Sequence, residues 1–208
     1  DVELASATGN HQFAIGVGST VWICGDSSFN IYDKDGNQLN GAGGGGGGFS
    51  PDADENLITG TGAGASVDGT NACHNIYLGT CAGNANVAGA NNVFLGNQAG
   101  RYTLHSGSNS QNVIIGNYAG HKFGSNSGDN PASNVIIGNC AGRCSNHNSS
   151  VMIGKNAGAC SHSSFSQFST FVGSYAGLKA KGSYNSFFGF SAGRCNNGGS
   201  SNVMIGSC

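Results

Sequence analysis

The sequence predicts an all-β repeat protein, a parallel β-solenoid, from its composition, a recurring short segment and the residues that fill that segment. Glycine supplies 38 of the 208 residues, proline supplies 2, and charged residues make up 9%. Glycine costs about 1 kcal/mol relative to alanine in a helix, so an ordinary helical protein is excluded. No window approaches the ~20 apolar residues of a membrane-spanning helix, and no strict G-X-Y period indicates collagen.

The recurring segment has the form N-x-x-x-G-x-x-A-G. Its central glycine lies at positions 60, 79, 96, 116, 138, 154, 173, 189 and 206, at intervals of 16 to 22 residues. The copies begin at Asn56, Asn75, Asn92, Asn112, Asn134, Ser150, Ser169, Asn185 and Asn202. Because the last copy is cut short at Cys208, we expect a processed chain or a fragment of a longer one.

Each copy predicts one coil of the solenoid. Three apolar or β-branched residues make a short strand, the central glycine permits a backbone conformation that other residues resist, and Ala-Gly turns a tight corner. A loop rich in Ser, Asn and Gly returns the chain to the next strand. Stacked at the inter-strand spacing of ~4.8 Å, about nine such coils make a rod of roughly 40 Å.

The first position of the copies has two possible roles. Stacked copies would place Asn75, Asn92, Asn112 and Asn134 above one another as a ladder of side-chain amides, which serines at the next two copies would interrupt. Alternatively, each asparagine caps only its own turn.

Both faces of the predicted strand are apolar. Side chains alternate along a strand, so the first and third strand residues, such as Ile76 and Leu78, share one face. A thin coil has one interior, and the other face would form an apolar stripe larger than a monomer usually exposes. We expect that stripe to be an oligomer interface in a closed assembly, a trimer about the rod axis, unless a wider solenoid buries both faces. The residues assigned to the interface are Tyr77, Phe94, Ile114, Ile136, Met152, Phe171, Phe187 and Met204.

Residues 56 to 208 resemble a known group of fibrous proteins. The N-x-x-[ILV]-G-x-x-A-G repeats are similar to those in tail-fibre proteins of marine bacteriophages and in the head domains of trimeric autotransporter adhesins. The resemblance implies a left-handed parallel β-roll, three chains about one axis, and a role in surface attachment. The loops here are longer and less even than in the adhesin heads, and cysteine is more frequent.

The chain before the repeats has a different character. Residues 1–40 lack the full repeat and predict strands near Trp22 and Phe29, a hairpin turn at 33–36, and at most a distant copy of the repeat near Phe13. Residues 41–55 contain six consecutive glycines and predict a flexible linker. The expected organisation is therefore an acidic N-terminal β segment, a linker, and a solenoid over residues 56–208.

Charge divides near the same boundary. Residues 1–72 carry nine acids and one base, and residues 73–208 carry seven bases and one acid, so the net charges are −8 and +6. Arg101, His121, Arg143 and Arg194 occupy the position after Ala-Gly, which predicts a basic stripe for an anionic glycan or another anionic surface. The alternative is a solvated edge that discourages sheet aggregation. A charge of +6 over 136 residues without a recognition motif disfavours nucleic acid.

Cysteines suggest one covalent link and no metal centre. Cys144 and Cys160 share a position on successive copies, and stacked equivalents ~5 Å apart are within disulfide range. The neighbouring Cys140, His147 and His162 give a loose zinc-like spacing, which does not predict a metal site. Paired carboxylates and nucleophile motifs are missing from the repeats, so we expect no enzyme activity and no cofactor.

The sequence thus predicts a structural and adhesive fibre segment of a virion tail fibre, outside the cell or on a surface. It would attach to a host through the loops at 101–111, 121–133 and 143–149, without inserting into the membrane. A self-assembling extracellular filament subunit and a bacterial trimeric adhesin head remain as alternatives. The receptor and the source are not fixed by the sequence.

Overall fold

A computed structural model describes two compact units, Asp1–Asp52 and Ala53–Cys208. The described residues are the strands 13–17, 20–25 and 31–33 of the first unit and residues 51–68, 71–103, 110–124, 131–161 and 166–207. Over this part of the chain the structure is all-β and has no helix, so no helix long enough to cross a membrane is found there.

The first unit contains an antiparallel three-stranded sheet. Its strands are β1 (Phe13–Val17), β2 (Thr20–Gly25) and β3 (Ile31–Asp33), with β2 in the middle. The strands predicted near Trp22 and Phe29 are confirmed as β2 and β3. The segment around Phe13 pairs antiparallel with β2 and is not a copy of the parallel repeat. The predicted hairpin turn at 33–36 and the glycine run lie outside the described residues, apart from Asp33 in β3.

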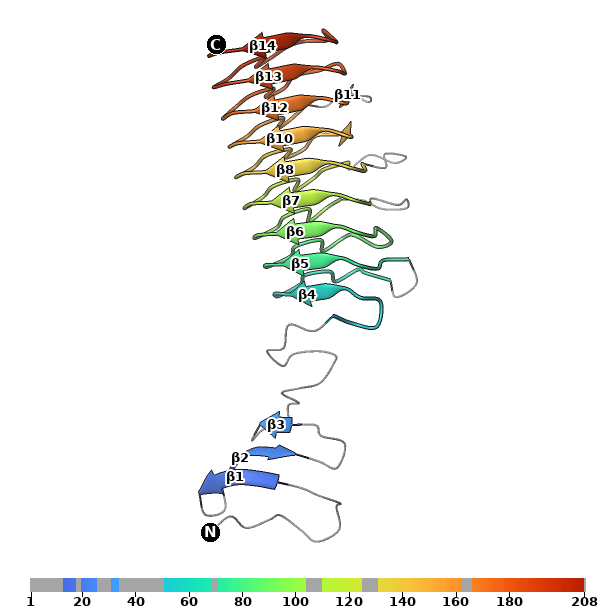
Figure 1. Ribbon diagram of the computed structural model, residues 1–208, viewed down its shortest axis with the longest axis vertical. Coiled ribbons are helices and arrows are strands. Elements are labelled where there is room, and N and C mark those ends of the chain that lie inside the picture. The colour runs from blue at the N-terminus through green and yellow to red at the C-terminus, as the bar shows by residue number, and fades with distance from the viewer. Residues whose placement is uncertain are drawn as a thin grey trace. The chain divides into compact units, whose positions relative to one another are not determined.

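The second unit is the predicted β-solenoid, in which each repeat adds one three-residue strand to a nine-stranded parallel sheet (Figure 1). Successive strands pair without a shift, so that Val151 lies beside Val135 and Thr170. A second, two-stranded sheet pairs β9 (His147–Asn148) with β11 (Ser166–Gln167). The strands of the large sheet are β4 (Leu57–Thr59), β5 (Ile76–Leu78), β6 (Val93–Leu95), β7 (Val113–Ile115), β8 (Val135–Ile137), β10 (Val151–Ile153), β12 (Thr170–Val172), β13 (Ser186–Phe188) and β14 (Val203–Ile205).

The glycine after each strand is fixed by the stacking of the coils. At Gly116 the backbone φ is 133°, a conformation that L side chains rarely adopt. A Cβ built there would lie 2.6 Å from the carbonyl oxygen of Gly138 in the next coil. The same close approach recurs from coil to coil. Glycine at this position therefore lets the chain turn at the same place in every coil while the strands stay aligned.

The asparagine ladder predicted as one of two alternatives is confirmed. The Oδ1 atom of Asn92 accepts hydrogen bonds from the backbone N–H (3.0 Å) and the side-chain Nδ2 (3.2 Å) of Asn112. Asn112 Oδ1 accepts from Asn134 in the same way, at 3.1 and 3.0 Å. These asparagines are buried, so the ladder pairs backbone and amide groups that would otherwise be without water or partner.

Serine continues the ladder, contrary to the expectation that it would interrupt it. The backbone N–H of Ser150 donates to Asn134 Oδ1 at 3.0 Å, and the N–H of Ser169 donates to the Ser150 hydroxyl at 3.1 Å. The N–H of Asn185 then donates to the Ser169 hydroxyl at 3.3 Å. A hydroxyl and an amide oxygen are both adequate acceptors for the next coil's N–H.

The assignment of the oligomer interface to the middle strand residues is wrong, because these residues fill the solenoid interior. They are fully buried within a single chain, except in the last coil, where Met204 is 37% exposed. The residues predicted at the interface and found on the inward face are Tyr77, Phe94, Ile114, Ile136, Met152, Phe171, Phe187 and Met204. The middle residue of each strand shares a face with the ladder asparagine two positions earlier, and both point inward.

The interior is narrow and layered. Opposite the middle strand residues runs a column of buried alanines from the Ala-Gly corners. Aromatic rings stack between coils, with the Tyr77 and Phe94 centroids 5.0 Å apart and those of Phe171 and Phe187 5.2 Å apart. Beside this pair, a third buried side chain completes most layers, and it ranges in size from Ala180 to Phe123.

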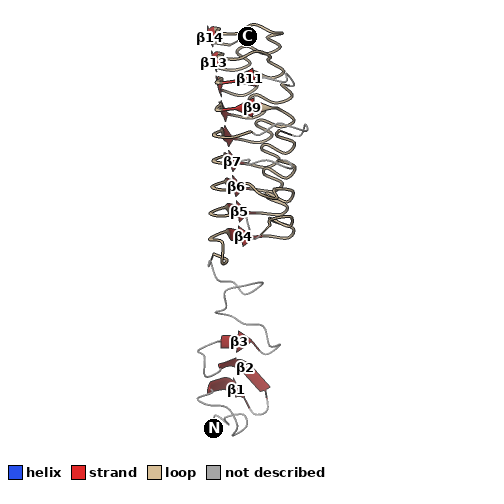
Figure 2. Cartoon of the chain, turned by 90° about the vertical axis from the view of Figure 1, so that its right-hand side faces the viewer, coloured by secondary structure: helices blue, strands red, loops and turns tan. Residues whose placement is uncertain are grey.

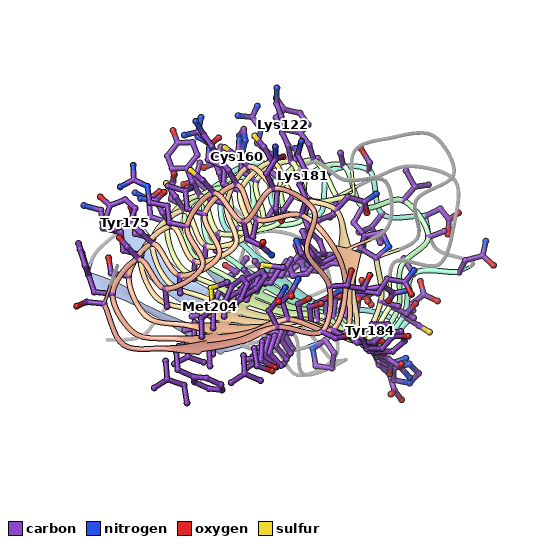
Figure 3. All side chains as sticks on the ribbon, turned by 90° about the horizontal axis from the view of Figure 1, so that it is seen from above. Lys122, Cys160, Tyr175, Lys181, Tyr184 and Met204 are labelled. Carbon is purple, nitrogen blue, oxygen red and sulfur yellow. The ribbon has the colours of Figure 1, made fainter. Side chains whose placement is uncertain are left out.

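The first and third strand residues point outward and make the sheet's outer face. Ile76, Leu78, Val113 and Ile115 are half-buried by their neighbours above and below, and no described segment of the chain covers them. Figure 3 shows their face along the lower edge, with the interior side chains on the other side of the ribbons. The apolar stripe is therefore present, on the face opposite to the one predicted.

Candidate anion-binding face

The basic side chains lie on the turn side of the solenoid, between each central glycine and the return loop. Figure 2 shows the strands along one side of the coils and the loops away from them. In Figure 3 the labelled Lys122, Cys160 and Lys181 lie across the coil from the strands, and Tyr175 lies at a neighbouring corner. We call this surface the turn face.

Arg101, His121 and Arg143 stack on three successive coils, as predicted. The coils are held in register by hydrogen bonds from Gly100 N–H to the Ala119 carbonyl (2.9 Å) and from Gly120 N–H to the Ala141 carbonyl (2.8 Å). The fourth predicted residue, Arg194, lies on the coil of β13. It is separated from the coil of Arg143 by those of β10 and β12.

A polar and aromatic cluster surrounds His121. The Oε1 atom of Gln98 accepts from Arg101 Nη1 at 3.1 Å and lies 3.0 Å from His121 Nε2. The Nε2 atom of Gln98 donates to the Tyr118 hydroxyl at 3.1 Å. The Arg101 guanidinium lies 4.8 Å from the centre of the Tyr102 ring, within cation–π range.

This geometry fixes the protonation of His121. An amide oxygen only accepts, so Nε2 carries the proton that points at Gln98. The other ring nitrogen, Nδ1, is buried and has no hydrogen-bond partner among the described residues. Burial, and then the charges of Arg143, Arg101 and Lys122, hold the pKa of His121 below its ordinary value. The imidazole is therefore neutral at pH 7, and the charge of this coil comes from Lys122.

A second cation–aromatic group lies further along the turn face. Tyr175 has Lys155 from the preceding coil and Arg194 from the following coil, each 5.9 Å from its ring centre. Phe190 meets the same ring edge-on at 6.0 Å. The tyrosine thus holds two cations from neighbouring coils along one line.

The predicted disulfide is not formed. Cys144 and Cys160 occupy equivalent positions on adjacent coils, as expected, and both are free thiols, the first half-buried and the second exposed. Cys73, Cys81, Cys140 and Cys195 are free thiols as well. No group of three or more potential metal ligands occurs in the described part of the chain.

Several residues of the turn face were not predicted from the sequence. Gln98, Tyr118 and Tyr175 share the second position after the central glycine, and Tyr102 follows Arg101 directly. Aligning the repeats by this position would have placed Gln98 and Tyr118 on successive coils beside the basic residues. Of the loops predicted to make contact, 143–149 is described, and residues 104–109 and 125–130 of the other two lie outside the described residues.

Acidic residues are scarce in the part of the sequence that forms the turn face. Residues 73–208 contain seven bases and one acid, Asp129, which lies outside the described residues. The face is therefore a continuous cationic surface beside ordered amide and phenol groups, which can bind anions and hydrogen-bond acceptors. Comparison with protein-family models, curated proteins and solved structures found no match to this chain.

Proposed function

We propose that this chain is a rigid segment of an adhesive fibre, of the kind that forms a virion tail fibre, and that its turn face attaches to an anionic host-cell surface. The observation that carries the proposal is the one-sided charge of the solenoid. The seven bases of residues 73–208 follow the central glycines of their coils, and Figure 3 shows Lys122 and Lys181 across the coil from the strands. The outer face of the sheet is apolar.

The stacking of the coils supports a mechanical role. Strand pairing, the asparagine–serine ladder and the glycine column all repeat along one axis, so each coil is tied to the next by backbone and side-chain hydrogen bonds. The resemblance of the repeat to phage tail-fibre and adhesin-head repeats agrees with this role.

The proposal includes a homotrimer. Nine three-residue strands make an outer sheet face of roughly 40 by 10 Å, about 400 Å², at ~4.8 Å per strand and ~3.3 Å per residue. A stable pairwise interface needs about 800 Å² per partner. The outer face supplies about half of that area, so residues that flank the sheet would have to add to the contact, and the number three is what the resemblance to fibres with three chains about one axis implies.

Two measurements test the proposal. Native mass spectrometry should give three chains, and a double variant that replaces Ile115 and Ile137 by lysine should give one, because charges would replace the apolar contact. The same protein should bind beads coated with a sulfated polysaccharide and ignore beads coated with its desulfated form. A stable monomer would remove the trimer, concentration-dependent growth of long fibres would favour a filament subunit, and equal binding to both beads would remove the attachment.

A further inference from the structure

Cationic side chains on the turn face occur on every one of six successive coils. The strands of these coils, β6, β7, β8, β10, β12 and β13, are consecutive neighbours in the sheet. Each coil supplies one or two cations, and in order these are Arg101, Lys122, Arg143, Lys155, the pair Lys179 and Lys181, and Arg194. The coils of β4 and β5, which precede them, supply none.

The spacing of these charges follows from the fold. Coils stack in register at ~4.8 Å, so six coils supply a cation at every rise of about 5 Å over roughly 24 Å. Arg101, Arg143 and Arg194 take the fifth position after the central glycine, and Lys122 and Lys179 take the sixth. Lys155 and Lys181 flank this band, at the first and eighth positions. All of these residues are exposed to solvent, except Arg101, which is half-buried. Tyr102 and Tyr175 hold three of the cations by cation–π contacts, which reduces the conformational entropy lost when a ligand binds.

Polar side chains form a second column beside the first. Asn97, Asn117 and Asn139 follow the central glycine on three successive coils, and all are exposed. Side-chain amides both donate and accept hydrogen bonds, as sugar hydroxyl groups require. The turn face therefore combines a band of charge with a neighbouring column of hydroxyl-binding amides, and Lys155 takes the position of that column on the next coil.

We propose that the turn face binds a linear acidic polysaccharide that lies along the rod axis, with one carboxylate or sulfate of the ligand at each coil. The inference rests on the proposed function and specifies the ligand and its direction. An extended polysaccharide repeats its sugar at nearly the rise of one coil, so successive anionic groups meet successive cations. The ligand then binds through additive contacts along the column, as in multivalent recognition.

A single-stranded nucleic acid is the competing ligand, and the observations favour it less. Such binding uses aromatic faces on which bases stack. Here the Tyr102 face is covered by Arg101, and Tyr175 is engaged by Lys155 and Arg194. The exposed asparagine column suits sugar hydroxyls and has no counterpart along a phosphate backbone.

A length series tests the ligand class. Fluorescently labelled oligogalacturonates of one to eight residues, which carry one carboxylate per sugar, should bind more tightly with each added residue up to about six and then level off. An affinity that does not depend on length overturns the inference, even where binding to sulfated beads persists and the proposed function stands. Tighter binding of an oligothymidylate with the same number of charges also overturns it.

A pair of variants tests the direction of the ligand. Arg143→Ala interrupts the array and leaves runs of two and three charged coils, whereas Arg194→Ala leaves a run of five. With the tetramer, Arg143→Ala should weaken binding by the same factor that separates the trimer from the tetramer on the unmodified protein, and Arg194→Ala should change it little. Equal effects of the two variants would show separate local sites and overturn the linear array.

The control for these variants is Thr80→Ala, which alters an exposed turn-face residue on a coil without a cation. It should bind every oligomer like the unmodified protein. Circular dichroism of each variant before titration establishes that the solenoid is intact.

Discussion

Replacement of Asn112 by alanine should destabilise the solenoid far more than replacement by serine. Asn112 donates from Nδ2 to Asn92 Oδ1 (3.2 Å) and to the Pro131 carbonyl (2.9 Å), and its Oδ1 accepts from the backbone N–H of Asn134 (3.1 Å). Alanine leaves that buried N–H without an acceptor, which costs about 1–3 kcal/mol, and removes further hydrogen bonds worth about 1 kcal/mol each. The expected total is about 3–5 kcal/mol.

Serine at position 112 should retain the central contact. The serines at 150 and 169 accept the next coil's N–H in this same position and donate to a carbonyl two residues earlier, at 3.1 and 3.3 Å. Asn112→Ser therefore loses the two Nδ2 bonds, to Asn92 Oδ1 and to the Pro131 carbonyl, and the second bond from Asn134. It leaves no buried N–H without an acceptor, so the expected loss is about 2 kcal/mol. Guanidinium unfolding followed by circular dichroism measures both variants, and equal losses for alanine and serine would refute the account of the ladder.

Five other substitutions and one change of pH give distinct outcomes. Burial lowers the pKa of His147 to about 3. The free energy of unfolding should therefore fall by about 2 kcal/mol between pH 7 and pH 5. His147→Gln should remove most of this dependence on pH. Gly116→Ala should lower the unfolding midpoint more than Gly198→Ala, because both glycines have positive φ but only the first faces the next coil's backbone. Phe94→Ala, which empties a buried position, should cost about 3–5 kcal/mol within one chain, whereas Leu95→Ala should chiefly weaken the assembly measured by native mass spectrometry.

The sign of the His147 effect follows from its contacts. The Ser161 hydroxyl donates to the Gly158 carbonyl at 2.8 Å, so it accepts from His147 Nε2 at 2.6 Å. The other nitrogen, Nδ1, is buried without a partner among the described residues. The folded state therefore binds the proton more weakly than the unfolded state, and stability falls as pH drops from about 6.5 towards 3.

The solenoid was predictable because its signal is periodic. Nine segments with one strand each, separated by glycine at nearly constant intervals, leave few other ways to pair the strands. The ladder was also visible in the sequence, and it contained the information that would have oriented the strands. A buried Asn75 and alternating side chains require Tyr77 to point inward and Ile76 outward, whereas hydrophobicity alone does not distinguish two apolar faces.

The turn face was predictable only in part. The position of Arg101, His121 and Arg143 after Ala-Gly predicted their stacking, because residues at one repeat position lie above one another. The neutral state of His121 depends on Gln98 of another coil and on burial, which no pattern within one repeat reveals. The single thiols of Cys144 and Cys160 show that equal repeat positions predict proximity and do not by themselves predict a bond.

Asparagine and serine serve in one hydrogen-bonded column, so the repeats are structurally equivalent. Each coil offers its neighbour an oxygen and receives an N–H, whatever the length of the loop that joins them, since the intervals vary from 16 to 22 residues without a break in strand register. Gain or loss of a whole repeat would therefore change the reach of the rod in steps of ~4.8 Å and create no new kind of contact. The length of the rod can therefore change during evolution by one repeat at a time, while the surface residues of each repeat change independently.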